Sequence, residues 1–288
     1  MDKAFKLILR ACVAITVITT VTVIFLLTKE SLVFFKQVSV FDFLFGTEWH
    51  PLLVPQSFGV LPLVFGTMTI VIGAVMLALP CGLMIAVYLS EYASDKGRKI
   101  LKPSLEILAG IPTIVYGYFA LTFITPLIKS IHPETEVFNG LSGAIVVAIM
   151  VLPMVSSLCD DAFRSVPANL KQGAFALGAN TFEVVKDVLL PASKGRIGAA
   201  VILAVSRAIG ETMAVTLAAG ATPKMGIKFF ESIQTMTAYI VQVSLGDTPQ
   251  GGIEYQSSFA VGALLFLMTL TMNFIGNTLI FKRNKVQL

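Results

Sequence analysis

Long apolar runs dominate the chain, and charged residues gather in the segments between them. Crossing the hydrocarbon core of a bilayer as a helix takes about 20 mainly apolar residues. Six runs approach or exceed that length, and Pro80, Pro112 and Pro153 predict kinks or tilts in the second, third and fourth. These runs cover residues 7–28, 62–90, 107–127, 141–158, 197–221 and 257–281. The pattern predicts an all-α polytopic membrane protein with six transmembrane helices.

Lysine and arginine are divided unequally between the two sets of loops. Fifteen of the 21 lie at the two termini, between residues 96 and 102, or in the 159–196 loop, whereas five lie in the other loops. Basic residues concentrate in the cytoplasmic loops of membrane proteins. We therefore expect a multi-pass protein of the cell membrane whose termini and 159–196 loop are cytoplasmic. No cleavage site with small residues follows the first run, so the first helix is expected to be retained.

Composition excludes several classes of function. The chain is 56% hydrophobic and only 13% charged, and its net charge of +4 is not concentrated, which argues against nucleic-acid binding. It contains no P-loop motif, no CxxC pair and no Cys/His cluster. The only histidines, His50 and His132, fall in outward-facing loops. We expect no catalytic residue, no metal and no cofactor in this chain, so energy for any work must come from an ion gradient or a partner.

Two charged residues, Arg207 and Glu211, interrupt the apolar run 197–221. An arginine at the centre of a membrane helix costs roughly 2.5–3.5 kcal/mol on insertion scales. If residue 197 lies at one interface, Arg207 is about 15 Å into the membrane, near the middle of its core. On one continuous helix the two side chains would lie about 40° apart. They would share a face with four alanines, at positions 200, 204, 214 and 218.

This placement predicts a polar pathway in which Arg207 meets an anion through parallel hydrogen bonds and Glu211 orients the arginine. The alternative is a structural ion pair within the helix. Arginine precedes glutamate here, which is the less favourable order for such a pair. Thr113 and Tyr116, which follow Pro112, are weaker candidates for lining the same pathway; Tyr116 can equally be an interfacial anchor.

The 159–196 loop contains a spaced motif. It reads Gln-Gly-Ala-Phe-Ala-Leu-Gly over residues 172–178 and, after nine residues, Val-Leu-Leu-Pro over residues 188–191. This resembles the EAA loop of ABC-importer permeases, although Gln172 and Gly173 replace the usual Glu and Ala. We expect a short amphipathic helix over 168–177, a turn at Gly178 and a second helix from residue 181. The resemblance implies that this segment contacts an ATPase, through Gln172, Gly173, Ala174, Leu177, Gly178, Val188, Leu190 and Pro191.

Four further segments narrow the resemblance. They are Tyr-Leu-Ser-Glu-Tyr-Ala over 88–93, Gly-Ile-Pro-Thr-Ile-Val-Tyr-Gly over 110–117, Arg-Ala-Ile-Gly-Glu-Thr-Met-Ala over 207–214 and Gly-Thr-Glu-Trp-His-Pro over 46–51. Together they resemble the PstC-type permeases of high-affinity phosphate ABC importers. In that family the matching Arg and Glu are linked to phosphate passage, which implies this role for Arg207 and Glu211.

The resemblance implies an architecture and a set of partners. Residues 1–58 would form a peripheral helix and an outward loop. Residues 59–288 would form a five-helix ABC-importer permease domain, with a cytoplasmic coupling helix between the fourth and fifth membrane helices. The expected partners are a PstA-like permease, two PstB-like ATPase subunits that bind ATP and Mg, and a PstS-like phosphate-binding protein. Phosphate and membrane lipid are the other expected contacts.

Three other functions stay open at this point. A permease for another oxyanion, such as sulfate or molybdate, would have a similar sequence. A proton-coupled secondary transporter could use Glu211 as a proton relay, although such carriers often show internal repeats and none is clear here. A purely structural membrane subunit would leave Arg207 and Glu211 without a function.

Overall fold

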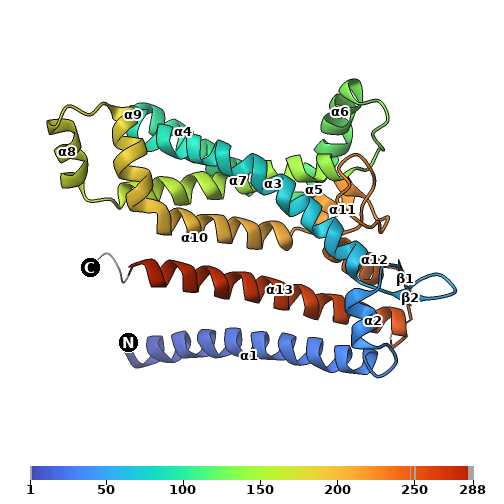
Figure 1. The fold of residues 1–288 in the computed structure, drawn as a ribbon. Coiled ribbons are helices and arrows are strands. Elements are labelled where there is room, and N and C mark those ends of the chain that lie inside the picture. The colour runs from blue at the N-terminus through green and yellow to red at the C-terminus, as the bar shows by residue number, and fades with distance from the viewer. Residues whose placement is uncertain (1, 247, 250, 285–288) are drawn as a thin grey trace.

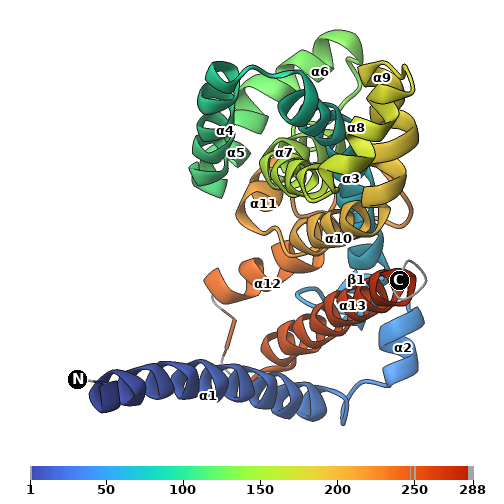
Figure 2. The same cartoon turned by 90° about the vertical axis from the view of Figure 1, so that its left-hand side faces the viewer.

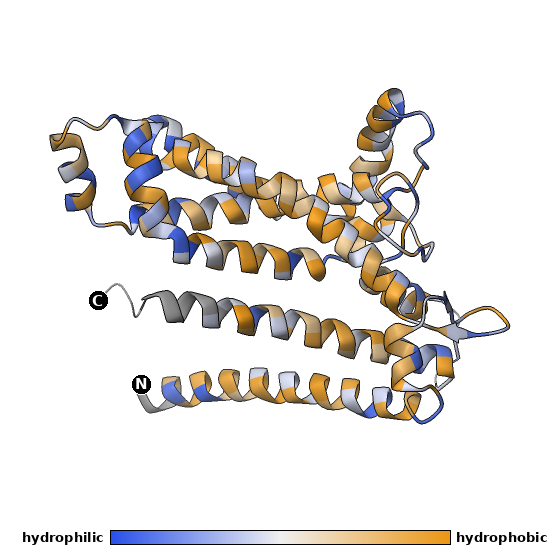
Figure 3. Cartoon of the chain, in the orientation of Figure 1, coloured by the Kyte–Doolittle hydropathy of each residue, from blue (hydrophilic) through white to orange (hydrophobic). Residues whose placement is uncertain are grey.

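Six helical segments of the computed structural model are long and apolar enough to span a membrane, which confirms the number predicted from the apolar runs. Apolar residues line the lengths of these helices, and polar residues gather at their ends and in the loops (Figure 3). The structure describes residues 2–246, 248–249 and 251–284. The six spans are Phe5–Phe34, Leu61–Tyr92, Thr113–Ile131, Gly140–Arg164, Thr181–Ile209 and Ile253–Gly276.

Helices account for nearly all of the regular structure, and one two-stranded hairpin pairs Trp49 with Phe58 (Figure 1). Elements up to the first long loop are α1 (Asp2–Phe34), α2 (Val40–Phe45), β1 (Trp49–His50), β2 (Ser57–Phe58), α3 (Leu61–Val87), the π-helical turn η1 (Tyr88–Tyr92), α4 (Asp95–Gly110), α5 (Thr113–Phe119), η2 (Ala120–Ile124) and α6 (Thr125–Ile131). The remaining elements are α7 (Gly140–Arg164), α8 (Ala168–Ala176), α9 (Thr181–Glu183), η3 (Val184–Leu189), α10 (Leu190–Ile209), α11 (Met213–Ala219), α12 (Met236–Leu245) and α13 (Ile253–Asn284).

The central contact of the bundle is the seam between α3 and α7, which is closed by glycines. A Cβ atom on Gly73 would lie 2.7 Å from the Cβ of Ala144, and one on Gly82 would lie 2.7 Å from Cγ1 of Val155. Membrane helices associate through small residues of this kind, because lipid provides no hydrophobic drive for their association. The largest core cluster surrounds this seam and extends to α10.

The N-terminal helix lies at the edge of the molecule. α13 lies between α1 and the other long helices in Figure 1, and the N-terminal half of α1 extends away from the bundle in Figure 2. At the end of the bundle that contains the hairpin, a second core cluster rich in aromatic rings joins the end of α1 to α2, the hairpin and α12. Trp49 packs edge-on against Tyr239, with ring centroids 4.8 Å apart. The division at residues 58 and 59 stays a prediction.

The sequence predicts the third span over residues 107–127, and this predicted start is wrong: the helix begins at Thr113. Residues 107–110 belong to α4, a separate amphipathic helix, and the chain is extended at Ile111. Pro112 then precedes the first turn of α5. Proline disfavours a helical residue before it and cannot donate a backbone hydrogen bond. The expected kink is therefore a complete break, whereas α3 and α7 continue through their prolines.

The predicted fifth span, 197–221, is wrong at both ends. Its helical segment starts at Thr181, after the Asn180 cap, and the part before residue 197 contains the charged residues Lys186, Lys194 and Arg196. It stops at Ile209, and a separate helix begins at Met213. The run of apolar residues therefore contains a helix break that hydropathy does not reveal.

The glycine seam is tested by Gly73→Ala. We expect this variant to destabilise the protein by about 1–3 kcal/mol, because the added methyl overlaps a Cβ that no rotamer change can move. The measurement is thermal unfolding of the purified protein in detergent. The matched control is Gly198→Ala in α10, whose added Cβ meets nothing within 4 Å. It should be neutral or stabilising by up to about 1 kcal/mol, and equal effects of the two changes would contradict the seam.

Candidate functional site

The helix that forms the fifth span breaks directly after Ile209, and residues 210–212 separate α10 from α11. The carbonyl of Glu211 accepts a hydrogen bond of 2.7 Å from the Thr237 hydroxyl at the start of α12. The carbonyl of Gly210 accepts one of 3.0 Å from the Thr212 hydroxyl, and the Glu211 amide donates to the Ala208 carbonyl. Irregular backbone at membrane depth occurs only where such groups are satisfied or face a water-filled cavity.

Arg207 and Glu211 occupy opposite sides of this break. Arg207 is exposed in the last turn of α10, where a positive charge is favoured by the helix dipole. Glu211 is only 8% exposed and lies between the two helices. No ion pair joins the two side chains within the part of the chain that the structure describes. The structural ion pair considered above is therefore absent, and each charge is positioned separately.

The predicted shared face of the two charges is wrong, because it assumed one continuous helix. The four alanines of that face are all buried and pack inside the protein, at positions 200, 204, 214 and 218. Their small side chains allow α10 to pack closely on α7 and α3, and α11 on α5. The sequence signal that could have revealed the break is Gly210, the residue before Glu211.

Thr113 and Tyr116 are placed at the join between α4 and α5. The hydroxyl of Tyr116 donates to the carbonyl of Leu108 over 2.6 Å, and its ring is buried. Tyr116 thus holds the end of α4 against α5 and is not an exposed interfacial anchor. Thr113 is partly exposed in the first turn of α5. A role for either residue in a pathway stays a prediction.

The motif of the 159–196 loop forms a projection at the opposite end of the bundle (Figure 1). The short helix α8 and the turn at Gly178, whose φ is +91°, lie where the sequence predicts them. Asn180 then caps α9 in a capping box with Glu183: each side chain accepts a hydrogen bond from the other residue's backbone amide.

The faces of this projection differ in chemistry. Ala174, Val188 and Leu190 pack against the main core, whereas Gln172, Gly173 and Pro191 are exposed. Leu177 is 91% exposed beside Gly178. Sequence reasoning missed two exposed aromatic neighbours, Phe175 and Phe182, which flank the turn. Together with Leu177, these side chains form an exposed apolar patch around the capped turn.

A cluster of charges beside the projection also escaped the sequence analysis. Asp160 of α7 has a side chain only 1% exposed and accepts from Arg98 of α4 over 2.6 Å and from Arg164 over 3.2 Å. Lys171 of α8 forms an ion pair with Glu91 of η1. Glu91 lies within the segment 88–93 used for the family resemblance, but its partner is 80 residues away and no spacing rule joins them.

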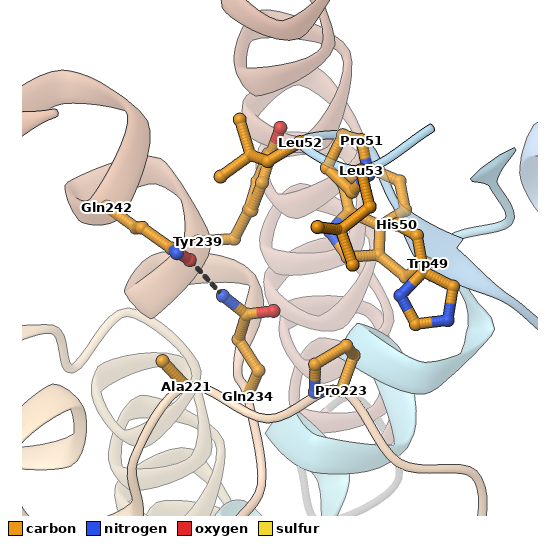
Figure 4. Close-up of a pocket in the computed structure, with 10 residues that line it drawn as sticks. All are labelled: Trp49, His50, Pro51, Leu52, Leu53, Ala221, Pro223, Gln234, Tyr239 and Gln242. Atoms are coloured by element: carbon orange, nitrogen blue, oxygen red, sulfur yellow. Dashed lines mark hydrogen bonds between the residues drawn. The ribbon is translucent and has the colours of Figure 1, made fainter. Parts of the chain in front are cut away.

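The end of the bundle that contains the hairpin has a cavity and a set of polar contacts. A cavity of about 260 Å³ opens between the hairpin loop, the 221–234 loop and α12 (Figure 4). Across it, Gln234 donates to Gln242 over 2.6 Å. Nearby, the backbone amide of Ser232 and the ammonium of Lys224 bond to Glu136 and hold the pKa of this carboxyl below its usual range. These bonds fix the loop after α11 against the loop before α7.

Comparisons with known proteins give a consistent result. The family whose model matches residues 78–284 is described as "Binding-protein-dependent transport system inner membrane component". The chain is 33% identical over 266 residues to "Probable ABC transporter permease protein YqgH" of Bacillus subtilis, covering 92% of this chain and 86% of that protein. It is 33% identical over 262 residues to the phosphate transport system permease protein PstC of Mesorhizobium japonicum, with coverage of 84% and 79%. It is 30% identical over 308 residues to PstC of Xylella fastidiosa strain 9a5c, with coverage of 99% and 92%.

Solved structures share the fold at low identity. A bacterial alginate ABC transporter in complex with its pentasaccharide-bound periplasmic protein contains a chain that aligns with a TM-score of 0.66 and 16% identity, covering 94% of this chain and 93% of that one. A chain of the MetNI methionine ABC transporter, in an inward-facing conformation, aligns with a TM-score of 0.56 and 17% identity, covering 78% and 94%.

The hydrogen bond that supports the helix break is tested by Thr237→Val. Loss of the hydroxyl leaves the buried Glu211 carbonyl without this donor, so we expect a destabilisation of about 1–3 kcal/mol. Thermal unfolding in detergent measures the effect. Thr271→Val in α13 is the matched control, because its exposed hydroxyl bonds only within its own helix. An equal response of both variants would show that the break does not depend on Thr237.

Proposed function

The chain belongs to the family of binding-protein-dependent transport system inner membrane components, and from this premise we propose that it forms half of the translocation pathway of an ATP-driven phosphate importer. It is a multi-pass membrane protein with the permease fold of ABC importers. The observation that carries the choice of phosphate is the identity of 30–33% to several PstC proteins over most of the chain. In this role the chain performs no bond chemistry.

The proposed anion site is the helix break. Arg207 is exposed at the end of α10, so its guanidinium is available to an anion or to a second permease subunit. A guanidinium binds phosphate oxygens through two parallel hydrogen bonds. Such a pair adds specificity for the geometry of the anion to the attraction between the charges. Glu211 limits the strength of binding, because a carboxylate nearby disfavours a bound anion. A pathway must release its cargo as well as bind it.

The proposed partners follow from the two ends of the molecule. Two PstB-like ATPase subunits would bind ATP and Mg, and one would contact the surface formed by Phe175, Leu177 and Phe182. A PstA-like permease would complete the pathway, and a PstS-like protein would deliver phosphate to the outward loops. The excess of basic residues near α8 and the termini supports a cytoplasmic location for this end.

The anion site is tested by Arg207→Gln. We expect phosphate uptake by whole cells to fall about tenfold or more, because a charge-assisted bidentate contact is lost. Arg207→Lys should recover only part of the uptake, since an ammonium cannot form the two parallel hydrogen bonds of a guanidinium. Arg196→Gln, in the first half of α10, changes an exposed arginine and should leave uptake unchanged. Normal uptake by an assembled Arg207→Gln transporter would remove Arg207 from the pathway.

The substrate and the energy source are tested together by uptake of labelled phosphate in cells. Excess unlabelled phosphate should compete, and sulfate or molybdate should not. Deleting the co-purifying ATPase should abolish uptake, because this chain has no nucleotide-binding motif of its own. Competition by sulfate would reassign the substrate to another oxyanion. Uptake that persists without the ATPase and follows the proton gradient would instead indicate a secondary transporter.

A further inference from the structure

We propose that Glu91 and Lys171 are positioning residues that transmit movement of α8 to α3, an inference that rests on the proposed contact between α8 and an ATPase. The two residues form the ion pair that joins α8 to η1, the π-helical turn continuing α3. If ATPase movement is passed on through α8, then α8 must be connected to the membrane helices. It has few such connections.

α8 is attached lightly to the rest of the molecule. None of its residues is fully buried, and its backbone neighbour is η3, which follows it in the same loop. Ala174 supplies an apolar contact with the core. The chain itself connects α8 to α7 through residues 165–167 and to α10 through η3. The pair Lys171–Glu91 adds a connection that leads to a different membrane helix, α3.

The ion pair between Lys171 and Glu91 is largely shielded from water. The side chain of Glu91 is 8% exposed and that of Lys171 is 21% exposed, unlike a surface salt bridge screened by water. The hydroxyl of Ser90 also donates to the same carboxylate oxygen, over 3.0 Å. Removing one partner leaves the other charge partly buried and unpaired, which costs more than the pair itself contributes.

The turn η1, which contains Glu91, is also hydrogen-bonded to α4 through Arg98. Arg98 donates to the carbonyl of Leu89, two residues before Glu91, over 3.4 Å and to Asp160 over 2.6 Å. Asp160 also holds Arg164 of its own helix. Through these bonds η1 is connected to α4 and α7, so a displacement of Glu91 reaches three membrane-proximal elements together. A π-helical turn at this point is typical of functional sites in helices.

The test uses charge reversal in the complete transporter, purified from membranes with its ATPase and reconstituted in vesicles. Glu91→Lys and Lys171→Glu should each lower anion transport by roughly tenfold, within the range by which mutations act on coupling. ATP hydrolysis should continue, so the ATP consumed per anion should rise. The double variant, Glu91→Lys with Lys171→Glu, should restore most of the transport and the original ratio.

Further variants separate coupling from folding. Lys171→Arg and Glu91→Asp keep the charges and should retain the ratio of ATP to anion. Lys99→Glu reverses an exposed lysine of α4 and should change nothing. Single reversals that transport normally would overturn the inference, as would a double variant that assembles but is no better than the singles. If the double variant fails to assemble, the neutral pair Glu91→Gln with Lys171→Met decides: wild-type coupling there would overturn the inference.

The outcome is independent of the substrate. A wild-type transporter that moves sulfate in place of phosphate would refute the proposed cargo, and the same variants could then be scored with sulfate. A wild-type transporter whose uptake needs no ATP would refute both proposals. Normal phosphate uptake with unaffected single reversals would refute only the role of Glu91 and Lys171.

Discussion

A helix can break inside a membrane only if its freed backbone groups find partners, and here Thr237 supplies one of them. Its hydroxyl bonds to the Glu211 carbonyl from α12, a short apolar helix. This bond ties the position of the break to the end of the molecule that contains the hairpin. Arg207 is left at the end of one helix and Glu211 between two, so the separation of the charges is a consequence of backbone chemistry.

One stretch of chain connects the proposed anion site to the proposed ATPase contact. α10 is 20 residues long, which corresponds to roughly 30 Å of rise, and it runs from the motif at Leu190 and Pro191 almost to the break. Leu190 is packed on the main core at one end, and Arg207 is exposed at the other. One helix therefore joins the two proposed functions directly, beside the proposed connection from α8 to α3.

Much of the fold could be predicted from sequence, because the bilayer imposes length and polarity on every crossing segment. The number of spans, the turn at Gly178 and the helix of α8 follow from such local rules. The break at residues 210–212 has only Gly210 as a local signal, and the Thr237 hydroxyl that supports it comes from a residue distant in sequence. The same applies to Glu91 and Lys171, whose pairing depends on tertiary packing. Hydropathy also placed the start of the third span wrongly, because it does not register the extended residue before Pro112.

The capped turn after α8 has a consequence for recognition. Gly178 already adopts the conformation that the turn requires, and Asn180 and Glu183 already satisfy each other's backbone amides. A segment ordered before contact loses little conformational entropy when a partner binds, so more of the contact energy remains as affinity. An ordered turn also deforms little when a bound partner moves. Displacement of the partner would therefore displace the whole projection.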